Sequence, residues 1–319
     1  MFNGKKVIVS HAPFSHVGSR ISERSLHKIF ALLPAVFLGI FFYGAPALGA
    51  AALSVSTAVM WESLFNRVAK RPDTVADGDA ALIGLLFAAL IPATSPWWFV
   101  VVGTFIAVVI GKQIFGGIGA NPVNPVLLAV AILMVSWKDL LDFDAALLNY
   151  DLAFKALEPL KALKGLGVEA AADFSMGDLL MGRQVGGVGA TFGLGLIAGG
   201  LYLIARGFIR WEIPVSFLAG VFVTALFFNM ADPAAYAGPL FHIFTGYTLI
   251  GAFFLAAEDA SSPVHLIPML IYGAGAGIMV ILIRNIGVYA DGVVFAILVF
   301  NLINPLLDKI RPKAMGKVI

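Results

Sequence analysis

The chain has 319 residues, of which 60% are hydrophobic and 13% charged, with a formal net charge of +2. Soluble domains carry about 25% charged residues, so this chain has too few charges to cover a water-facing surface, and we expect lipid to surround most of it. The absence of cysteine excludes disulfides and thiolate-held metal or Fe–S centres, and the five histidines show no metal-ligand spacing.

Apolar segments long enough to cross a bilayer, about 20 residues each, recur ten times along the chain. The predicted spans cover residues 29–44, 46–65, 79–95, 97–115, 122–138, 188–208, 213–231, 239–257, 264–284 and 288–307. They predict an all-α polytopic membrane protein of about ten transmembrane helices. Outside the spans we expect a cytoplasmic N-terminal segment (1–28), one long loop (139–187) and a cytoplasmic C-terminal tail (308–319).

The positions of Lys and Arg predict the orientation, because basic residues gather on the cytoplasmic side of a membrane. With the N-terminus in the cytoplasm, 15 of the 21 basic residues fall on that side. Five of the other six lie in the loop 139–187 or directly before it, where the rule is weak, and the sixth is Arg284. We therefore expect both termini in the cytoplasm and the long loop on the outer side.

Five spans fall within residues 29–138 and five within 188–307, and an odd number of spans per half predicts two inverted halves. The third span ends in PATSP and the eighth in AAEDASSP, so each has a Ser-Pro break after an Ala-rich helix. These breaks would run in opposite directions through the membrane. Coincidence in an Ala-rich sequence is the alternative explanation.

The sequence FGGIGANPVNP (115–125) places two Asn-Pro pairs and three glycines where the fifth span begins. Proline lacks a backbone donor, and the residue before it avoids helical geometry. Non-helical backbone at membrane depth is tolerated where it is buried in protein or lines a cavity. We expect Asn121 and Asn124 to bind a planar heteroaromatic ring, although a simple helix-entry turn would have the same sequence.

Two glycine-rich segments have different predicted roles. GRQVGGVGATFGLG (182–195) lies at the outer mouth of the sixth span, where glycine permits close backbone approach or tight helix packing. GAGAG (273–277) lies inside the ninth span without a preceding strand. It is therefore predicted to be a packing motif rather than a nucleotide fingerprint.

Acidic residues near the ends of spans are candidates for a cation-linked role, because carboxylates in hydrocarbon are unfavourable and usually functional. The candidates are Asp77, Glu258, Asp259 and Asp291. Glu258 and Asp259 are the most suggestive, because no Asp, Glu, Lys or Arg lies between Asp232 and Glu258 and a Ser-Pro break follows. Solvated helix ends are the alternative.

Taken in order, the motifs resemble the RnfD/NqrB family, whose members belong to the Rnf complex and to the sodium-pumping NADH:quinone oxidoreductase. The similar segments are SHAPFSH, DGDAALIGLLFAALIP, GKQIFGGIGANPVNP, GATFG, GYTLIGAFFLAAEDASSP and YADGVVFAILVFNLINPLLD. GKQIFGGIGANPVNP is specific, whereas the apolar helices between the motifs are not. The region before the first span is shorter than is typical of the quinone-reducing member, so the Rnf member is favoured.

The resemblance implies a membrane flavoprotein subunit that passes electrons between flavins across the bilayer and couples ferredoxin:NAD oxidoreduction to Na⁺ or H⁺ transport. It implies FMN joined by a phosphoester to Thr191, beside Gly189 and Ala190, on the side away from the cytoplasm. It also implies a second, non-covalent flavin such as riboflavin near Asn121 and Asn124. The family pattern has Ser or Thr three residues before the acceptor, where this chain has Val.

The partners that the resemblance implies are the other Rnf proteins, namely the membrane proteins RnfA and RnfE, the flavin protein RnfG, and the Fe–S and flavin proteins RnfB and RnfC, within the bacterial or archaeal cytoplasmic membrane. Nucleic acid is not among them. Two alternatives stay open. One is an NqrB-like component of the sodium-pumping quinone reductase. The other is a non-redox secondary transporter with inverted repeats, which accounts for broken helices but not for Gly-Ala-Thr at an outer helix mouth.

Overall fold

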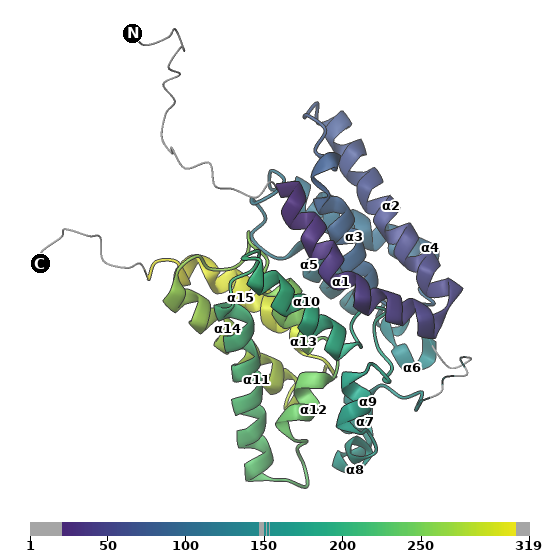
Figure 1. The fold of residues 1–319 in the computed structure, drawn as a ribbon, viewed down its shortest axis with the longest axis vertical. Helices are drawn as coiled ribbons and strands as arrows, with labels where there is room; N and C mark the ends of the chain where they lie inside the picture. Colours follow the sequence, from purple (N-terminus) through teal and green to yellow (C-terminus); the bar gives the residue numbers. More distant parts are fainter. Residues whose placement is uncertain (1–20, 147–149, 151, 153, 311–319) are drawn as a thin grey trace, which may run out of the picture.

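The computed structural model describes residues 21–146, 150, 152 and 154–310, and in this part of the chain every regular element is a helix (Figure 1). The SHAPFSH motif (10–16) lies outside the described residues. The helices are α1 (Ile21–Tyr43), α2 (Ala45–Val68), η1 (Val75–Asp77), α3 (Asp79–Leu90), α4 (Trp97–Phe105), η2 (Ile106–Gln113), α5 (Pro125–Ser136), η3 (Lys138–Leu141), α6 (Phe143–Ala146), α7 (Pro159–Leu166), α8 (Val168–Ala172), α9 (Met176–Leu180), α10 (Gly193–Ala205), α11 (Glu212–Ala231), α12 (Pro239–Phe244), α13 (Thr248–Ile250), η4 (Gly251–Leu255), α14 (Leu266–Asn285) and α15 (Val293–Leu307).

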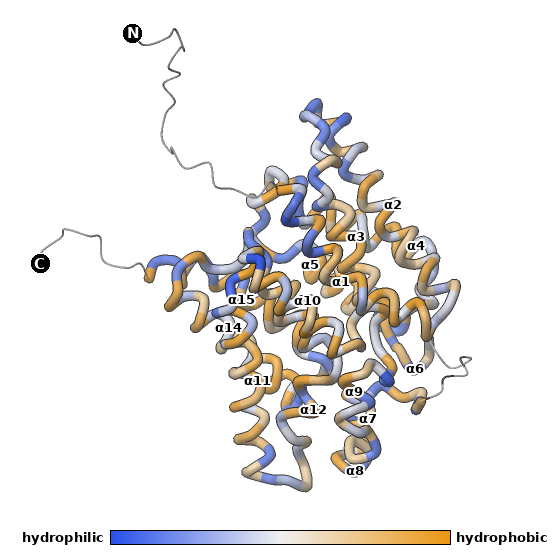
Figure 2. The backbone as a smooth tube through the Cα atoms, viewed as in Figure 1, coloured by the Kyte–Doolittle hydropathy of each residue, from blue (hydrophilic) through white to orange (hydrophobic). Residues whose placement is uncertain are grey.

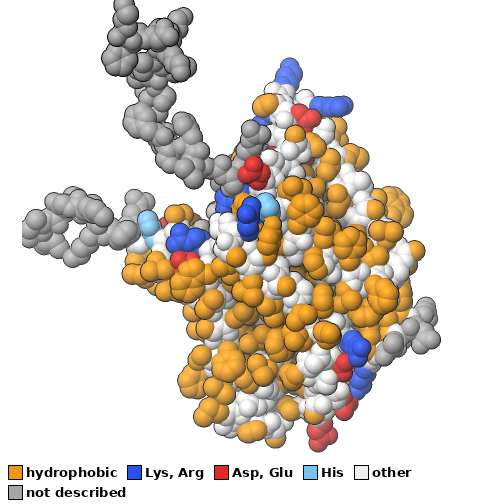
Figure 3. Space-filling view, in the orientation of Figure 1, with side chains coloured by type: hydrophobic (Ala, Val, Ile, Leu, Met, Phe, Trp, Pro, Cys, Tyr) orange, Lys and Arg blue, Asp and Glu red, His pale blue; other side chains and the backbone are white. Residues whose placement is uncertain are grey.

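Four of the described helices, α1, α2, α11 and α14, are long and apolar enough to cross a bilayer. Shorter apolar helices accompany them, namely α3, the continuous α4–η2 segment, α5, α10 and α15. Hydropathy is high along most of these helices, and hydrophobic side chains cover the flank of the molecule (Figures 2 and 3). Phe41 and Met230 are 79% and 70% exposed, which is unfavourable in water and ordinary in lipid. The chain is a multi-pass membrane protein, and the regular elements of its described part are all helices.

The helices form two groups. In Figure 1 the helices α1–α5 lie toward the upper right, and α10–α15 toward the lower left. The groups meet where α1 packs against α10 and α5 packs against α15. The short helices α7–α9, which come from the long loop, lie against α10, α12 and α14 at the lower end.

Small residues bring α14 and α11 into close contact. A Cβ atom added at Gly277 would lie 2.2 Å from the carbonyl oxygen of Phe217, and one at Gly273 would lie 2.7 Å from that of Ile213. No side chain fits at either position while the helices stay this close. The GAGAG segment is therefore a packing motif, as its sequence predicts.

The third and eighth predicted spans are shorter or more broken than their hydropathy suggests. The helix α3 ends at Leu90, because Ile91 is extended and Pro92 follows. The eighth segment is divided into α12, α13 and η4, with a break around Gly246, whose φ of +62° favours glycine. A Cβ at Gly246 would also lie 2.4 Å from a carboxylate oxygen of Asp291.

Candidate functional site

Two pockets lie at opposite ends of α1. Ile21, Arg24 and Lys28, from the first turns of α1, line one of them. At the other end of α1, the hydroxyl of Tyr43 donates to the carbonyl oxygen of Gln184, 3.5 Å away, and Gln184 lines the second. A helix of 23 residues is roughly 35 Å long, about the thickness of a bilayer core. The pockets are called the Asn121 pocket and the Thr191 pocket below, after the sequence-predicted residues that line them.

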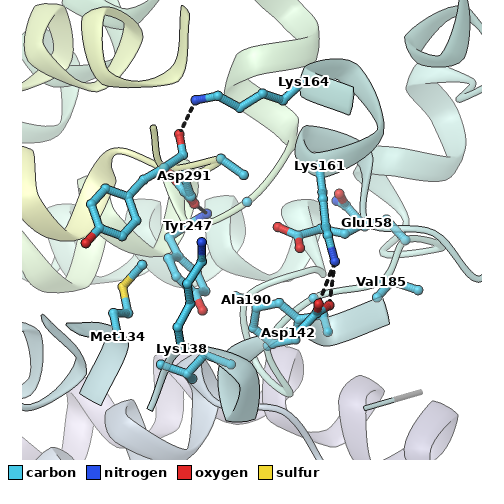
Figure 4. A pocket seen from close by; sticks show the side chains of 18 of the residues that line it. Met134, Lys138, Asp142, Glu158, Lys161, Lys164, Val185, Ala190, Tyr247 and Asp291 are labelled. Atoms are coloured by element: carbon cyan, nitrogen blue, oxygen red, sulfur yellow. Dashed lines mark hydrogen bonds and ion pairs between the residues drawn. The ribbon is translucent and has the colours of Figure 1, made fainter. Parts of the chain in front are cut away.

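The Thr191 pocket has a volume of about 360 Å³, within the range of small-molecule sites. It lies between the glycine-rich segment before α10, the long loop, and the segments before α13 and α15. Thr191 is 5% exposed and Ala190 is also buried. The side chains that line it include Met134, Lys138, Asp142, Glu158, Lys161, Lys164, Val185, Tyr247 and Asp291 (Figure 4).

The broken end of α3 holds the Gly-Ala-Thr turn in place. The last carbonyl groups of a helix have no partner within it. Here the amide of Gly189 donates to the carbonyl of Ala89 at 3.0 Å, and the amide of Val188 donates to that of Ile91 at 3.3 Å. A Cβ at Gly189 would lie 2.7 Å from the Cβ of Ala89, so glycine is required for this close approach. Thr191 follows directly, at the entrance to α10.

A buried arginine holds the break between α12 and α13. The guanidinium of Arg284, with 1% of its side chain exposed, donates to the carbonyls of His242 at 2.7 Å and Thr245 at 3.3 Å. It also forms an ion pair with Asp291 at 3.0 Å. The other oxygen of this carboxylate accepts from the amide of Tyr247 at 2.7 Å. The Tyr247 side chain is thereby fixed in the wall of the Thr191 pocket.

The loop side of the Thr191 pocket carries interleaved charges. Lys161 lies 2.6 Å from Asp142 and 3.3 Å from Asp144, with Glu158 beside it (Figure 4). Burial raises the pKa of Asp142, but hydrogen bonds from Lys161 and the backbone outweigh it and hold this pKa below its usual range. Burial, with the carboxylates of Asp144 and Asp291 nearby, raises the pKa of Glu158 to about 8.

Lys164 joins the loop to the segment before α15. Its ammonium donates to the carbonyl of Gly287 at 2.5 Å and to that of Tyr289 at 2.7 Å. These carbonyls follow the end of α14, where an ammonium is favourable both as a hydrogen-bond donor and as a charge. The lysine therefore ties α7 to the mouth of the pocket.

The Asn121 pocket has a volume of about 400 Å³ and contains both predicted asparagines. The amide of Asn121 donates to a carboxylate oxygen of Glu258 at 3.0 Å and to the carbonyl of Val123 at 3.1 Å. The side-chain oxygen of Asn124 caps α5, while its amide donates to the carbonyl of Leu255 at the end of η4, 3.1 Å away. The Asn-Pro segment and the Ser-Pro break of the eighth span thus meet at one site.

The predicted acidic residues divide between the two pockets. Glu258 and the exposed Asp259 line the Asn121 pocket, and Asp259 pairs with Arg24 and Lys28 at 2.8 and 3.0 Å. Asp291 lines the Thr191 pocket, where Arg284 compensates its charge. Asp77 lines neither pocket, and its carboxylate accepts from the amide that begins α3.

Sequence reasoning missed a buried cluster beside the Asn121 pocket. Lys112, which lines the pocket and is 1% exposed, pairs with Glu62 at 3.0 Å and with Asp79 at 2.8 Å. Gln113 also donates to Glu62, at 3.0 Å. The signal in the sequence was Glu62, a glutamate inside an apolar span. Its charge is unfavourable there without a partner. Arg284 was visible too, because it departs from the positive-inside pattern although it lies far from the long loop in the sequence.

Comparison with known proteins gives one consistent result. The model of the NQR2, RnfD, RnfE family matches residues 8–316. The chain is 35% identical to the D subunit of the Na⁺-translocating ferredoxin:NAD⁺ oxidoreductase complex of Acetobacterium woodii, over 96% of this chain and 94% of that protein. It is 34% identical to the D subunit of the ion-translocating oxidoreductase complex of Stutzerimonas stutzeri, over 94% of both chains.

A further relative is the D subunit of the ion-translocating oxidoreductase complex of Cronobacter sakazakii, which is 33% identical over 97% of this chain and 98% of that protein. Both the family model and these relatives cover nearly the full length, including the segments that form the two pockets. The chain belongs to the NQR2, RnfD, RnfE family.

Proposed function

We propose that this chain is the membrane flavoprotein subunit of an Rnf-type complex, in which it passes electrons between flavins across the bilayer. The complex couples ferredoxin:NAD oxidoreduction to transport of Na⁺ or H⁺, as the name of the relative from Acetobacterium woodii states for that protein with Na⁺. The observation that carries the proposal is the pair of pockets at opposite ends of α1, one with Thr191 and one with Asn121 and Asn124.

The proposal includes ten membrane crossings in two inverted five-helix halves, with both termini in the cytoplasm. Four long helices, five shorter apolar helices and the broken α12–η4 segment together supply ten crossings. The equivalent first helices α1 and α10 pack together, as do the equivalent fifth helices α5 and α15. A twofold axis in the membrane plane would produce both contacts. The Asn121 pocket is then cytoplasmic and the Thr191 pocket lies on the outer side.

The Thr191 pocket fits a covalently attached FMN. Thr191 lies on the pocket wall, three lysines (Lys138, Lys161 and Lys164) among acidic residues offer ammonium donors for a phosphate, and the volume suits a flavin. Thr191 would hold the phosphate through a phosphoester on its hydroxyl oxygen, and the turn at Gly189 and Ala190 would fix that oxygen. The bound flavin supplies one- and two-electron chemistry, while the protein positions it and excludes water.

The Asn121 pocket fits a second, non-covalent flavin such as riboflavin. A flavin ring has both donors and acceptors along one edge, and an asparagine side chain can match both. Asn121 already lies at hydrogen-bonding distance from Glu258. A carboxylate beside a redox site changes its affinity for a cation when the charge in the site changes, because Coulomb interactions are strong away from water. Glu258 is therefore our first candidate for the residue that couples electron transfer to cation binding, ahead of Asp259, Asp77 and Asp291.

The proposed partners are the remaining proteins of the complex, namely the membrane proteins RnfA and RnfE, the flavin protein RnfG, and the Fe–S and flavin proteins RnfB and RnfC. The relatives' names describe one component of a multi-subunit complex. Two other functions stay open as alternatives, an NqrB-like role in a sodium-pumping quinone reductase and a non-redox transporter with inverted repeats. A transporter gives no reason for Thr191 to line a pocket that offers ammonium donors.

The test separates covalent from released flavin in purified protein. After acid precipitation, the wild type and Thr191→Ser, which keeps the hydroxyl, should retain flavin fluorescence on a denaturing gel. Thr191→Val should lose it. Asn124→Leu should lose the acid-released flavin and keep the covalent one. Colourless wild-type protein, or covalent flavin in Thr191→Val, would contradict the proposal.

A further inference from the structure

Gln184 occupies an unusual position beside Thr191. Its side chain is 1% exposed, and its amide nitrogen lies 2.7 Å from the carbonyl oxygen of Phe244, 3.1 Å from that of Leu179 and 3.3 Å from that of Thr191. These carbonyls come from the end of α12, from α9 and from the Gly-Ala-Thr turn. Because three carbonyl oxygens surround this atom, only the nitrogen can occupy the position, and the amide orientation is fixed.

The same geometry leaves the side-chain oxygen of Gln184 without a partner. This atom is fully buried, and no donor among the described residues reaches it. Buried acceptors without a partner are rare in folded proteins and call for an explanation. Within the described part of the chain, several residues carry such unpartnered buried atoms, and Gln184 is the one among them that lines the Thr191 pocket. Its free lone pairs indicate a donor supplied by a ligand.

We propose that the side-chain oxygen of Gln184 accepts a hydrogen bond from a ribityl hydroxyl of the flavin attached at Thr191. The inference rests on the proposed function. The ribityl chain is the part of FMN next to the phosphate, and each of its hydroxyls is a donor. The side-chain nitrogen of Gln184 donates to the carbonyl of Thr191 itself, so the Gln184 amide lies close to the attachment point. At this position it meets the ribityl chain rather than the flavin ring.

Gln184 thereby has two separable roles. Its nitrogen fixes the backbone of Thr191 relative to α9 and α12, and its oxygen orients the attached flavin. It is a positioning residue, and the roles separate by substitution. Gln184→Glu keeps an acceptor and removes the donor, whereas Gln184→Leu removes both. A background without the covalent flavin, Thr191→Val, isolates the structural role of the nitrogen.

The experiment measures three quantities in detergent-purified protein. They are the thermal midpoint from tryptophan fluorescence, the visible circular dichroism of the covalent flavin, taken as the difference from Thr191→Val, and the covalent flavin per protein on a denaturing gel. In the Thr191→Val background, Gln184→Leu and Gln184→Glu both lower the midpoint. With flavin attached, we expect Gln184→Leu to lose a further ~2–4 °C relative to Gln184→Glu and at least about half of the visible dichroism.

The outcomes decide whether the side-chain oxygen of Gln184 contacts the attached flavin. Loss of loading in Gln184→Leu with loading retained in Gln184→Glu supports the proposal. Equal midpoint losses in both backgrounds with unchanged dichroism would overturn it, as would loss of loading in both variants while the protein still folds. The control Gln113→Leu removes a buried glutamine, 3% exposed, at the other end of the helices and should leave the covalent flavin per protein unchanged. Wild-type protein without flavin at Thr191 would instead overturn the proposed function.

Discussion

Arg284→Met tests whether one buried arginine holds the break in the eighth span. Its guanidinium bonds two carbonyls at the break, those of His242 and Thr245, and the hydroxyl of Thr248 at 2.8 Å. It also compensates the buried carboxylate of Asp291. Methionine fills a similar volume and provides no donor, so all of these groups would lose their bond to the guanidinium together.

The expected effect is large. Removing one member of a buried ion pair costs about 3–5 kcal/mol, because the remaining charge stays buried without compensation. Arg183→Met is the matched control, since Arg183 pairs with Asp178 at 3.2 Å and both side chains are exposed, at 60% and 47%. An exposed pair contributes up to about 1 kcal/mol, so this control should unfold almost as the wild type does. In Arg284→Met with Asp291→Leu, part of the loss should be recovered, because no charge is left buried.

The assay is denaturant unfolding in detergent, followed by tryptophan fluorescence at fixed protein and detergent concentration. The free energy of unfolding should fall for Arg284→Met and stay near the wild-type value for Arg183→Met. If both single variants unfold within about 1 kcal/mol of each other, Arg284 is not a structural clamp. If the double variant is less stable than Arg284→Met, the uncompensated carboxylate of Asp291 is not the source of the loss.

Three further predictions concern the pockets. Burial, with Asp144 nearby, raises the pKa of Glu158 from 4.5 to about 8, so the stability that this carboxyl contributes is present below pH 4.5 and is lost as the pH rises to about 8. Glu158→Gln should remove that slope from thermal midpoints measured across this window, and an unchanged slope would contradict the assignment. Gly189→Val should destabilise the protein by about 1–3 kcal/mol, because the valine side chain has no room beside Ala89. It should also reduce the covalent flavin seen on a denaturing gel. A normal amount of covalent flavin would refute the close approach. Asn124→Ala should cost about 1 kcal/mol through loss of the α5 cap, measured by denaturant unfolding, while covalent flavin stays unchanged; covalent flavin that falls in parallel would show that the pockets are not independent.

Much of the fold follows from the sequence because backbone polar groups in hydrocarbon must be hydrogen-bonded within the protein. Apolar segments of sufficient length form helices wherever lipid surrounds them, so each predicted span contains a helix. The Asn-Pro pairs also predicted non-helical backbone before α5, and the structure places both asparagines in a pocket wall. Helix ends were less predictable. Pro92 marks the end of α3 in the sequence, but the donors that bind its last carbonyls come from the Gly-Ala-Thr turn, in a distant part of the chain.

The break at Gly246 was missed for a related reason. No proline marks it, and a single glycine inside an apolar stretch is common in membrane helices. The donors that stabilise the break come from Arg284, which Asp291 holds in place, about 40 residues further along, so no local pattern contains the information. The same holds for Gln184, whose three carbonyl partners lie on separate segments. Sequence predicts which residues are unusual, whereas their partners follow only from the fold.

The central claim is that Thr191 carries FMN, and the mass of the peptide that contains Thr191 tests it most directly. A phosphoester replaces the hydroxyl hydrogen of Thr191 with the phosphoryl group of FMN. We predict that this peptide from the purified complex is heavier by the mass of FMN less one water, with fragment ions that place the addition on Thr191. An unmodified peptide, with all flavin released by acid, would contradict the account.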